Sequence, residues 1–285
     1  MKGKSEKINE TIIQPGSKWF GLDFRELWFY RDLVKILIYR DIVVYYKQTI
    51  LGPLWFVIQP LFSTFVFTLV FSGFAGLSTE GLPAPIFYLS GIIIWNYFSE
   101  SLNMISESFW RNYRVFDKVY FPRFIIPVSI ALSNLIRFLL QLLIFIVVIW
   151  YYAYHKSITV NLGTPLLLLP LLVLQMVTLA VGFGSAVAAL TTKYRDLKMA
   201  ILFFVQLWMY VTPIVYPIDK VPTKYLLVYS FNPVVSVVEL FRKSFFGVSA
   251  LQLWQIELSI AVTLVIFLIG ITLFSRAEKN FMDVI

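Results

Sequence analysis

Few residues in this chain have the type and spacing that catalysis or metal binding requires. There is no cysteine, so no disulfide framework, thiolate nucleophile or thiolate metal site can form. The single histidine, His155, has no cluster of partner ligands around it in the sequence. We find no H-E-x-x-H, no G-x-S-x-G and no phosphate-binding loop. We therefore predict that the chain is not an enzyme and that it binds no metal or cofactor itself.

Two charged residues, Glu100 and Arg137, lie within long apolar runs of the sequence. At the midplane of a bilayer a charged side chain costs roughly 2.5–3.5 kcal/mol unless it is paired or hydrated. We therefore expect Arg137 to face the protein interior, with Glu100 at a similar depth as its candidate partner. Two interpretations stay open for these residues, a structural ion pair and a role in a substrate pathway.

Aromatic residues make up 18% of the chain, and many lie deep within the apolar runs. A buried ring with a polar tip can form a hydrogen bond while its face stacks on an apolar surface. Sugar rings offer both CH faces and hydroxyls, so an aromatic-lined channel would suit a glycan. The other interpretation is that the rings only fill contacts between helices and with lipid. The candidates for lining a pathway are Trp55, Phe62, Trp95, Phe98, Phe204, Trp208 and Tyr210.

The composition indicates that these residues are held by membrane helices. Of the 285 residues 59% are hydrophobic and only 14% are charged, and the mean hydropathy is +0.78. A helix of about 20 apolar residues, at a rise of ~1.5 Å each, crosses the ~30 Å hydrocarbon core of a bilayer. We therefore predict an all-α integral membrane protein with six transmembrane helices. The expected spans cover residues 54–75, 86–105, 124–154, 165–190, 199–215 and 256–274.

The segment before the first span has a different pattern. Leu27, Tyr30, Val34, Leu37 and Ile38 recur at three- and four-residue steps, with charges of both signs between them. This pattern is typical of an amphipathic helix that lies on the cytoplasmic leaflet, or of one that packs on another protein. We divide the chain into a flexible N-terminus (1–23), a cytoplasmic amphipathic interface helix (24–53), a six-span transmembrane domain (54–275) and a cytoplasmic tail (276–285).

Basic residues give the orientation of the predicted spans. Eighteen Lys or Arg residues lie on one side of the predicted membrane and five on the other. Because cytoplasmic loops carry the excess of Lys and Arg, both termini are expected in the cytoplasm. The net charge of +8 is therefore a topology signal, and we expect no nucleic-acid partner.

The segment after the fifth span is too broken by proline to cross a membrane and too hydrophobic for an ordinary loop. Prolines 213, 217, 222 and 233 precede an apolar stretch that contains Glu239 and Arg242. Irregular backbone at membrane depth is tolerated only where protein or a water-filled cavity satisfies it. We predict a re-entrant helical segment that caps a pathway, with Pro233, Glu239 and Arg242 as gate residues. A surface hairpin is the alternative.

Several motifs occur in a characteristic order along most of the chain. They are YKQTILGPLW (46–55), YLSGIIIWNYF (88–98), FPRFIIP (121–127), YRDLK (194–198), TPIVYPIDKVP (212–222) and NP (232–233). In these motifs the sequence resembles the type-2 ABC exporter permeases, in particular the branch that exports O-antigen, capsular polysaccharide and teichoic acid. The resemblance covers about residues 30–280.

The resemblance implies a homodimer in the cytoplasmic (inner) membrane, with two copies of a separate ABC ATPase subunit that carry the ATP and Mg. The substrate would be a lipid-linked polysaccharide that passes through a pathway at the dimer interface. A coupling helix would fall within residues 107–123, where Trp110, Tyr113, Arg114 and Phe116 are the predicted ATPase contacts. The alternative is a type-2 permease for a small hydrophobic or ionic solute, but the aromatic excess and the long N-terminal helix favour a glycan.

Overall fold

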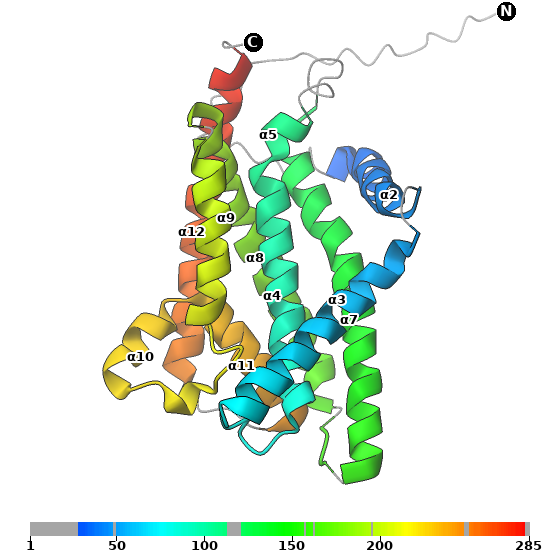
Figure 1. Cartoon of the computed structure of the whole chain (residues 1–285). Helices are drawn as coiled ribbons and strands as arrows, with labels where there is room; N and C mark the ends of the chain where they lie inside the picture. Colours follow the sequence, from blue (N-terminus) through cyan, green and yellow to red (C-terminus); the bar gives the residue numbers. More distant parts are fainter. Residues whose placement is uncertain are drawn as a thin grey trace, which may run out of the picture.

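The described part of the chain folds entirely into helices joined by short connections (Figure 1). The computed structural model describes residues 28–47, 50–112, 121–156, 158–161, 163–194, 196–247 and 251–282. This confirms the predicted all-α fold, while the predicted flexible N-terminus (1–23) lies outside the described residues. The helices are α2 (Arg31–Lys47), η1 (Gly52–Leu54), α3 (Trp55–Phe67), the π-helical η2 (Thr68–Phe74), α4 (Ala84–Ser106), α5 (Ser108–Arg111), α7 (Ile125–Lys156), α8 (Gly163–Lys193), α9 (Leu197–Val211), η3 (Ile218–Lys220), α10 (Thr223–Ser230), α11 (Pro233–Phe246) and α12 (Leu253–Met282).

Four described segments are long and apolar enough to cross a membrane, which agrees with the predicted first, third, fourth and sixth spans. They are Gly52–Phe74, Ile125–His155, Gly163–Lys193 and Leu253–Lys279. The other two predicted spans do not meet this criterion: α4 has 23 residues but contains several polar ones, and α9 has only 15 residues. The structure therefore shows several membrane helices, and the count of six stays a prediction.

Five helices, α4, α7, α8, α9 and α12, run lengthwise in the same general direction and form a bundle (Figure 1). Helix α4 lies inside it against α7 and α8, and its apolar side chains, such as Phe87, Ile93 and Phe98, are completely buried. The α2 helix lies beside α7 at one end of the bundle, whereas α10 and α11 lie at the other end (Figure 1). Helix α12 continues to Met282, so most of the predicted tail (276–285) extends this helix.

The closest helix–helix approach is between α8 and α12, where two glycines face each other. A Cβ atom added to Gly270 would overlap the carbonyl oxygen of Gly182, and one added to Gly182 would meet the backbone of Phe267. Small residues at such a crossing let two membrane helices gain van der Waals contact over a long interface. The two glycines therefore let α8 and α12 pack at short range.

The chain breaks between α2 and α3 where the sequence places Gly52 and Pro53. Gly52 has a φ of +48°, which glycine adopts without a steric penalty, and Pro53 lies in the first turn of η1. Helix α2 ends at Lys47, and α3 begins only at Trp55. The break separates the α2 segment from the first membrane helix.

Candidate functional site

The two charged residues predicted within apolar runs are joined in the structure. Arg137 of α7 donates a hydrogen bond from Nη1 to Oε2 of Glu100 on α4 at 3.0 Å. The guanidinium carbon of Arg137 also lies 4.9 Å from the ring centroid of Phe56 on α3. Three helices therefore meet around one cation, which is stabilised by an opposite charge and an aromatic face. The Arg137 side chain is 10% exposed but that of Glu100 is 36% exposed, so the carboxylate is also accessible from outside the subunit.

A second ion pair, Glu239–Arg242, is completely buried within α11. The two side chains are one helical turn apart and 0% exposed, and Nη1 of Arg242 lies 3.0 Å from Oε1 of Glu239. The same guanidinium lies over the ring of Phe87 on α4, 3.7 Å from its centroid, and its Nε donates to Oγ of Ser90 at 3.1 Å. A buried ion pair is stable only when further bonds replace lost hydration, as they do here.

Arg242 also satisfies backbone that has no helical partner. Its Nη1 donates to the carbonyl oxygen of Pro213 at 2.8 Å and its Nη2 to that of Ile214 at 3.2 Å. These carbonyls lie just beyond the end of α9, where proline interrupts the helix. A third carbonyl, that of Phe87 on α4, accepts from Nη2 at 3.3 Å. One buried side chain therefore fastens α11 to α4 and to the irregular segment that leaves α9.

Acidic groups surround this cation at the same end of the bundle. Burial raises the pKa of the Glu80 carboxyl in the loop before α4, Arg242 opposes that rise, and Asp219 adds to it. The Oε2 atoms of Glu80 and Glu239 are buried, and neither has a hydrogen-bond partner among the described residues. Within the described part of the chain no three His, Asp or Glu side chains are placed to hold a metal ion.

Pro233, the third predicted gate residue, begins α11 and is buried. The preceding Asn232 caps this helix by accepting from the backbone N–H of Val234 at 3.2 Å, and its Nδ2 donates to Oγ1 of Thr212 at 3.1 Å. Ser259 of α12 donates to the carbonyl of Pro233 at 3.3 Å. The α10–α11 hairpin is therefore bonded to the ends of both flanking helices, and its depth in the membrane stays a prediction.

The structure divides the predicted pathway aromatics into two groups. Trp95 and Phe98 of α4 are buried against Trp208 of α9, with ring centroids 6.4 and 5.3 Å apart, respectively. Phe183 of α8 joins the same cluster. Within the subunit these ring faces therefore stack on one another rather than line an open surface. The remaining candidates are all at least half exposed, namely Trp55 and Phe62 on α3 and Phe204 and Tyr210 on α9.

Of the predicted ATPase contacts, only Trp110 lies among the described residues, because Tyr113, Arg114 and Phe116 fall in the gap at 113–120. Trp110 belongs to the short helix α5 and is 40% exposed. Its neighbour Phe109 is buried and stacks on Phe274 of α12, with the centroids 4.6 Å apart. This stacking holds α5 on the bundle and leaves the Trp110 side chain partly at the surface.

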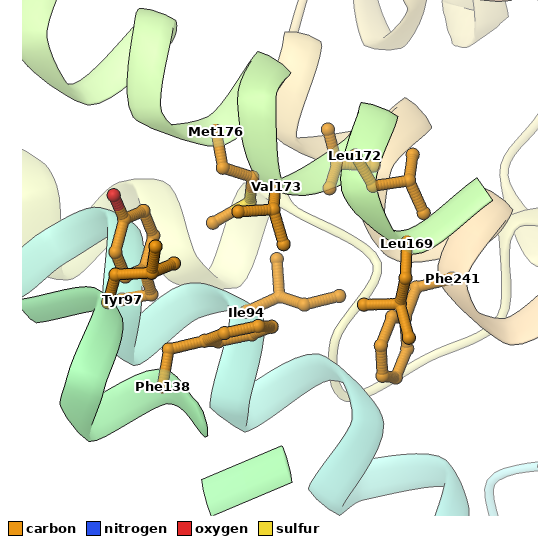
Figure 2. Close-up of a pocket in the computed structure, with 10 residues that line it drawn as sticks. Ile94, Tyr97, Phe138, Leu169, Leu172, Val173, Met176 and Phe241 are labelled. Atoms are coloured by element: carbon orange, nitrogen blue, oxygen red, sulfur yellow. The ribbon is translucent and has the colours of Figure 1, made fainter. Parts of the chain in front are cut away.

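An apolar pocket lies between α4, α7, α8 and α11 (Figure 2). Ile94, Phe138, Met176 and Phe241 are among the residues that line it. The hydroxyl of Tyr97 donates to the carbonyl of Ala131 at 3.3 Å, so it is already occupied. The lining therefore offers no free polar group that could orient a sugar.

Sequence reasoning missed the partners that α4 supplies to Arg242, namely Phe87 and Ser90. It also missed the ion pair between Glu107 and Lys198, which are 2.8 Å apart. Glu107 and Lys198 are charged residues at the ends of predicted spans, and this could have signalled the pair. No local pattern identifies Ser90 as a partner, since it lies 152 residues from Arg242 in the sequence.

The fold and these sites define a helical integral membrane protein with one ion pair between α4 and α7 and a second, buried pair within α11. Residues 32–246 match the family described as ABC-2 type transporter, and this match covers well over half of the chain. The chain therefore belongs to the ABC-2 type transporter family, as its motifs predicted. It is a transporter component, and in this family a separate subunit hydrolyses ATP.

Curated relatives match the chain over most of both lengths. The O-antigen export system permease protein RfbA of Klebsiella pneumoniae is 24% identical over 85% of this chain and 90% of its own length. The protein of the same name from Myxococcus xanthus is 25% identical over 84% and 89%, respectively. The polysialic acid transport protein KpsM of Escherichia coli is 23% identical over 80% and 87%.

Proposed function

We propose that this chain is the membrane subunit of an ATP-driven exporter that moves a lipid-linked polysaccharide across the cytoplasmic membrane. The observation that carries the proposal is the similarity, over at least 80% of the chain, to relatives named for O-antigen export and polysialic acid transport. The exposed rings on α3 and α9 and the absence of cysteine and histidine clusters from the sequence support transport of a glycan rather than chemistry on it.

The proposed topology has six spans with both termini in the cytoplasm. It is supported by the position of α4 and α9, which run between the two ends of the bundle alongside the four apolar spans (Figure 1). In this arrangement α2 lies on the cytoplasmic surface. Its exposed Ile36 and Val44 would then contact lipid. The α10–α11 hairpin would lie in the outer leaflet and close the pathway.

Two chains and two ATPase subunits form the proposed assembly. The partly exposed Trp110 on α5, with Tyr113, Arg114 and Phe116 after it, supplies the ATPase contact on the cytoplasmic side. ATP and Mg are held by the partner. Nucleotide binding can drive export only if the ATPase docks differently on the inward- and outward-open states of this chain. The exposed faces of α3 and α9 are the proposed lining of the pathway between the two chains.

Deletion of the gene in its natural host tests this function. We expect surface polysaccharide to be lost and lipid-linked polymer to accumulate inside the cell, with both effects reversed by the wild-type gene. Undiminished polymer at the surface, combined with altered efflux of a small apolar or ionic solute, would instead support the small-solute permease. A purified chain that binds ATP without any partner would contradict the two-subunit arrangement.

A further inference from the structure

The incompletely buried positions of α4 are mostly polar, whereas those of a lipid-facing helix are apolar. Between residues 90 and 106 only five residues of α4 are not buried, and four of the five are polar. The helix is nevertheless surrounded by apolar spans and buries its own Ile, Leu, Phe and Trp side chains. The four residues, which we call the α4 polar strip, are Asn96, Ser99, Glu100 and Asn103.

The α4 polar strip lies on one face of the helix, because its members recur at steps of three, four and seven residues. It covers about 10 Å of helix length, from the middle of α4 toward the α5 end. Other helices of the bundle expose a different kind of face. On α7 the exposed side chains beside Arg137, the partner of Glu100, are Ile136 and Leu139, and Leu143 follows one turn further on; all three suit hydrocarbon. The strip therefore faces something other than lipid.

The strip can form hydrogen bonds but carries little net charge. Its one ionised group, the Glu100 carboxylate, is neutralised by Arg137 at 3.0 Å. Asn96 and Asn103 add amide donors and acceptors, and Ser99 adds a hydroxyl. Oδ1 of Asn103 is buried and has no hydrogen-bond partner among the described residues. An acceptor left in this state is costly unless a bound molecule or water satisfies it.

This chemistry selects among possible occupants. A phosphate or another anion would meet no free cation here, and an apolar solute would desolvate two amides and a carboxylate without replacing their bonds. Sugar hydroxyls both donate and accept, and they require no charge. The strip lies on α4, which contacts both α3 and α9, the two helices that carry the exposed rings Trp55, Phe62, Phe204 and Tyr210.

We propose that the α4 polar strip is the hydrophilic wall of the transport pathway, where it exchanges hydrogen bonds with the hydroxyls of the passing sugar chain. The inference rests on the proposed function and assigns residues to its substrate site. A row of polar groups with little net charge binds each sugar unit weakly and with similar affinity. A long polymer can therefore move along the row without being held at any one contact. Arg137 positions the Glu100 carboxylate and offsets its charge.

Cysteine accessibility tests whether the strip faces water, independently of the substrate. The wild-type chain has no cysteine, so single Asn96→Cys, Ser99→Cys and Asn103→Cys variants need no altered background. Each is assembled with its ATPase in native membranes and treated with a charged, water-soluble thiol reagent. We expect modification about tenfold or more faster than for the lipid-facing control Leu143→Cys, because only a hydrated thiol ionises and reacts.

Three outcomes of this assay would contradict the proposal that the α4 polar strip lines the transport pathway. Labelling of the strip variants as slow as that of Leu143→Cys would place the strip in lipid. Spontaneous disulfides between two copies of the chain, in variants that the water-soluble reagent does not label, would show that the strip is a closed subunit contact. Fast labelling at the same rate in cells that make the lipid-linked polymer and in cells that lack it would show that the strip faces water but does not contact the glycan. Protection by the polymer is the supporting result.

Apolar substitution then tests the role in transport. We expect Asn96→Leu with Asn103→Leu to lower surface polymer at least about fivefold at unchanged protein level, since buried sugar hydroxyls would lose their partners. The matched control is Thr178→Val, a partly exposed hydroxyl on α8 that donates only to its own helix at Leu174. Equal export by the double variant and the control would overturn the glycan role. Loss of the proposed function itself would appear separately, as surface polymer that persists when the gene is deleted.

Discussion

Arg242 shows how a single side chain can hold irregular membrane backbone in place. Its guanidinium donates to three backbone carbonyls, a hydroxyl and a carboxylate, and it also covers an aromatic ring. Each bond replaces water that the buried cation has lost. These bonds join α4, α11 and the segment after α9. We call Arg242 with these bonds the latch, and it explains why the proline-rich region has a fixed position.

Arg242→Ala should destabilise the protein strongly. The substitution leaves Glu239 buried without its counter-charge and frees the carbonyls of Pro213 and Ile214, and breaking such a pair costs about 3–5 kcal/mol. We expect a large fall in the thermal midpoint of the detergent-solubilised protein, measured by size-exclusion chromatography after heating. The neighbouring Lys243→Ala removes an exposed cation and is the matched control, for which little change is expected.

A double variant separates the ion pair from the other bonds of Arg242. Glu239→Leu combined with Arg242→Met removes both charges and should recover part of the stability that Arg242→Ala loses, because the uncompensated carboxylate is gone. A double variant no more stable than Arg242→Ala would show that the bonds to the carbonyls matter more than the charge. If the Arg242→Ala variant were as stable as the wild type, Arg242 would not be what holds the segment after α9 in place.

Residue-scale features were predictable from the sequence only where the pattern is local. Glu100 and Arg137 stand out because each is a charge in an apolar run, and their need for a partner suggested the pairing that the structure shows. Trp95, Phe98 and Trp208 also stood out, but their type alone could not show that they stack on one another. The contact of Arg242 with Ser90 depends on how distant segments pack, which no spacing encodes.

Among the helical elements, α8 and α12 have the tightest contact. Gly182 and Gly270 allow the two backbones to touch, and neither position has room for a methyl group. In lipid there is no hydrophobic force that pushes helices together, so close van der Waals packing of this kind provides much of the association energy. The crossing therefore determines how the last helix of the bundle is placed.

Gly270→Ala should separate these helices. The added methyl would collide with backbone rather than with the flexible end of a side chain, so the helices must shift, at an expected cost of about 1–3 kcal/mol. Thermal stability in detergent and the amount of folded protein measure the effect. Gly73→Ala is the control, because its methyl would meet only the carbonyl of Thr68 at 3.7 Å. Similar losses for the two variants would contradict the role of the crossing.

The joint between α2 and α3 leads to a prediction about motion. Gly52→Ala with Pro53→Ala should strain the positive φ at residue 52 by about 1–2 kcal/mol or force the two helices into one. We expect surface polymer to fall severalfold while membrane insertion, measured by the amount of protein in washed membranes, stays near wild type. Equal losses of insertion and export would assign the break to folding alone.

At the scale of elements, hydrophobic runs predicted four of the spans because length and composition suffice to define them. The same criteria do not show whether α4 and α9 cross the membrane. The polar residues of α4 make it resemble a soluble helix, and α9 is shortened where Thr212 and Pro213 end it. The prolines correctly indicated a broken segment after α9, although its two helices, α10 and α11, acquire their positions from bonds to distant elements.

The whole molecule has two unlike ends. One end carries α2, α5 and the last turns of α12, and two ion pairs, Glu107–Lys198 and Arg123–Glu278, join its helices. The other end carries the loop before α4, the α10–α11 hairpin and the buried latch. The proposed six crossings require that α4 and α9, which run lengthwise in the bundle, cross the membrane beside the four spans that apolarity identifies.

Single cysteines at connections between the helices distinguish six crossings from four. The variants Ser78→Cys, Arg111→Cys, Thr159→Cys and Asp196→Cys all alter exposed residues. A membrane-impermeant thiol reagent is added to intact cells from which any outer barrier has been removed. With six spans, positions 78 and 159 should react, whereas 111 and 196 should react only after the membrane is permeabilised, because the basic ends stay in the cytoplasm. If α4 and α9 did not cross, positions 111 and 196 would react from outside and 159 would not. Residue 78 is outside in both cases and so serves as the positive control.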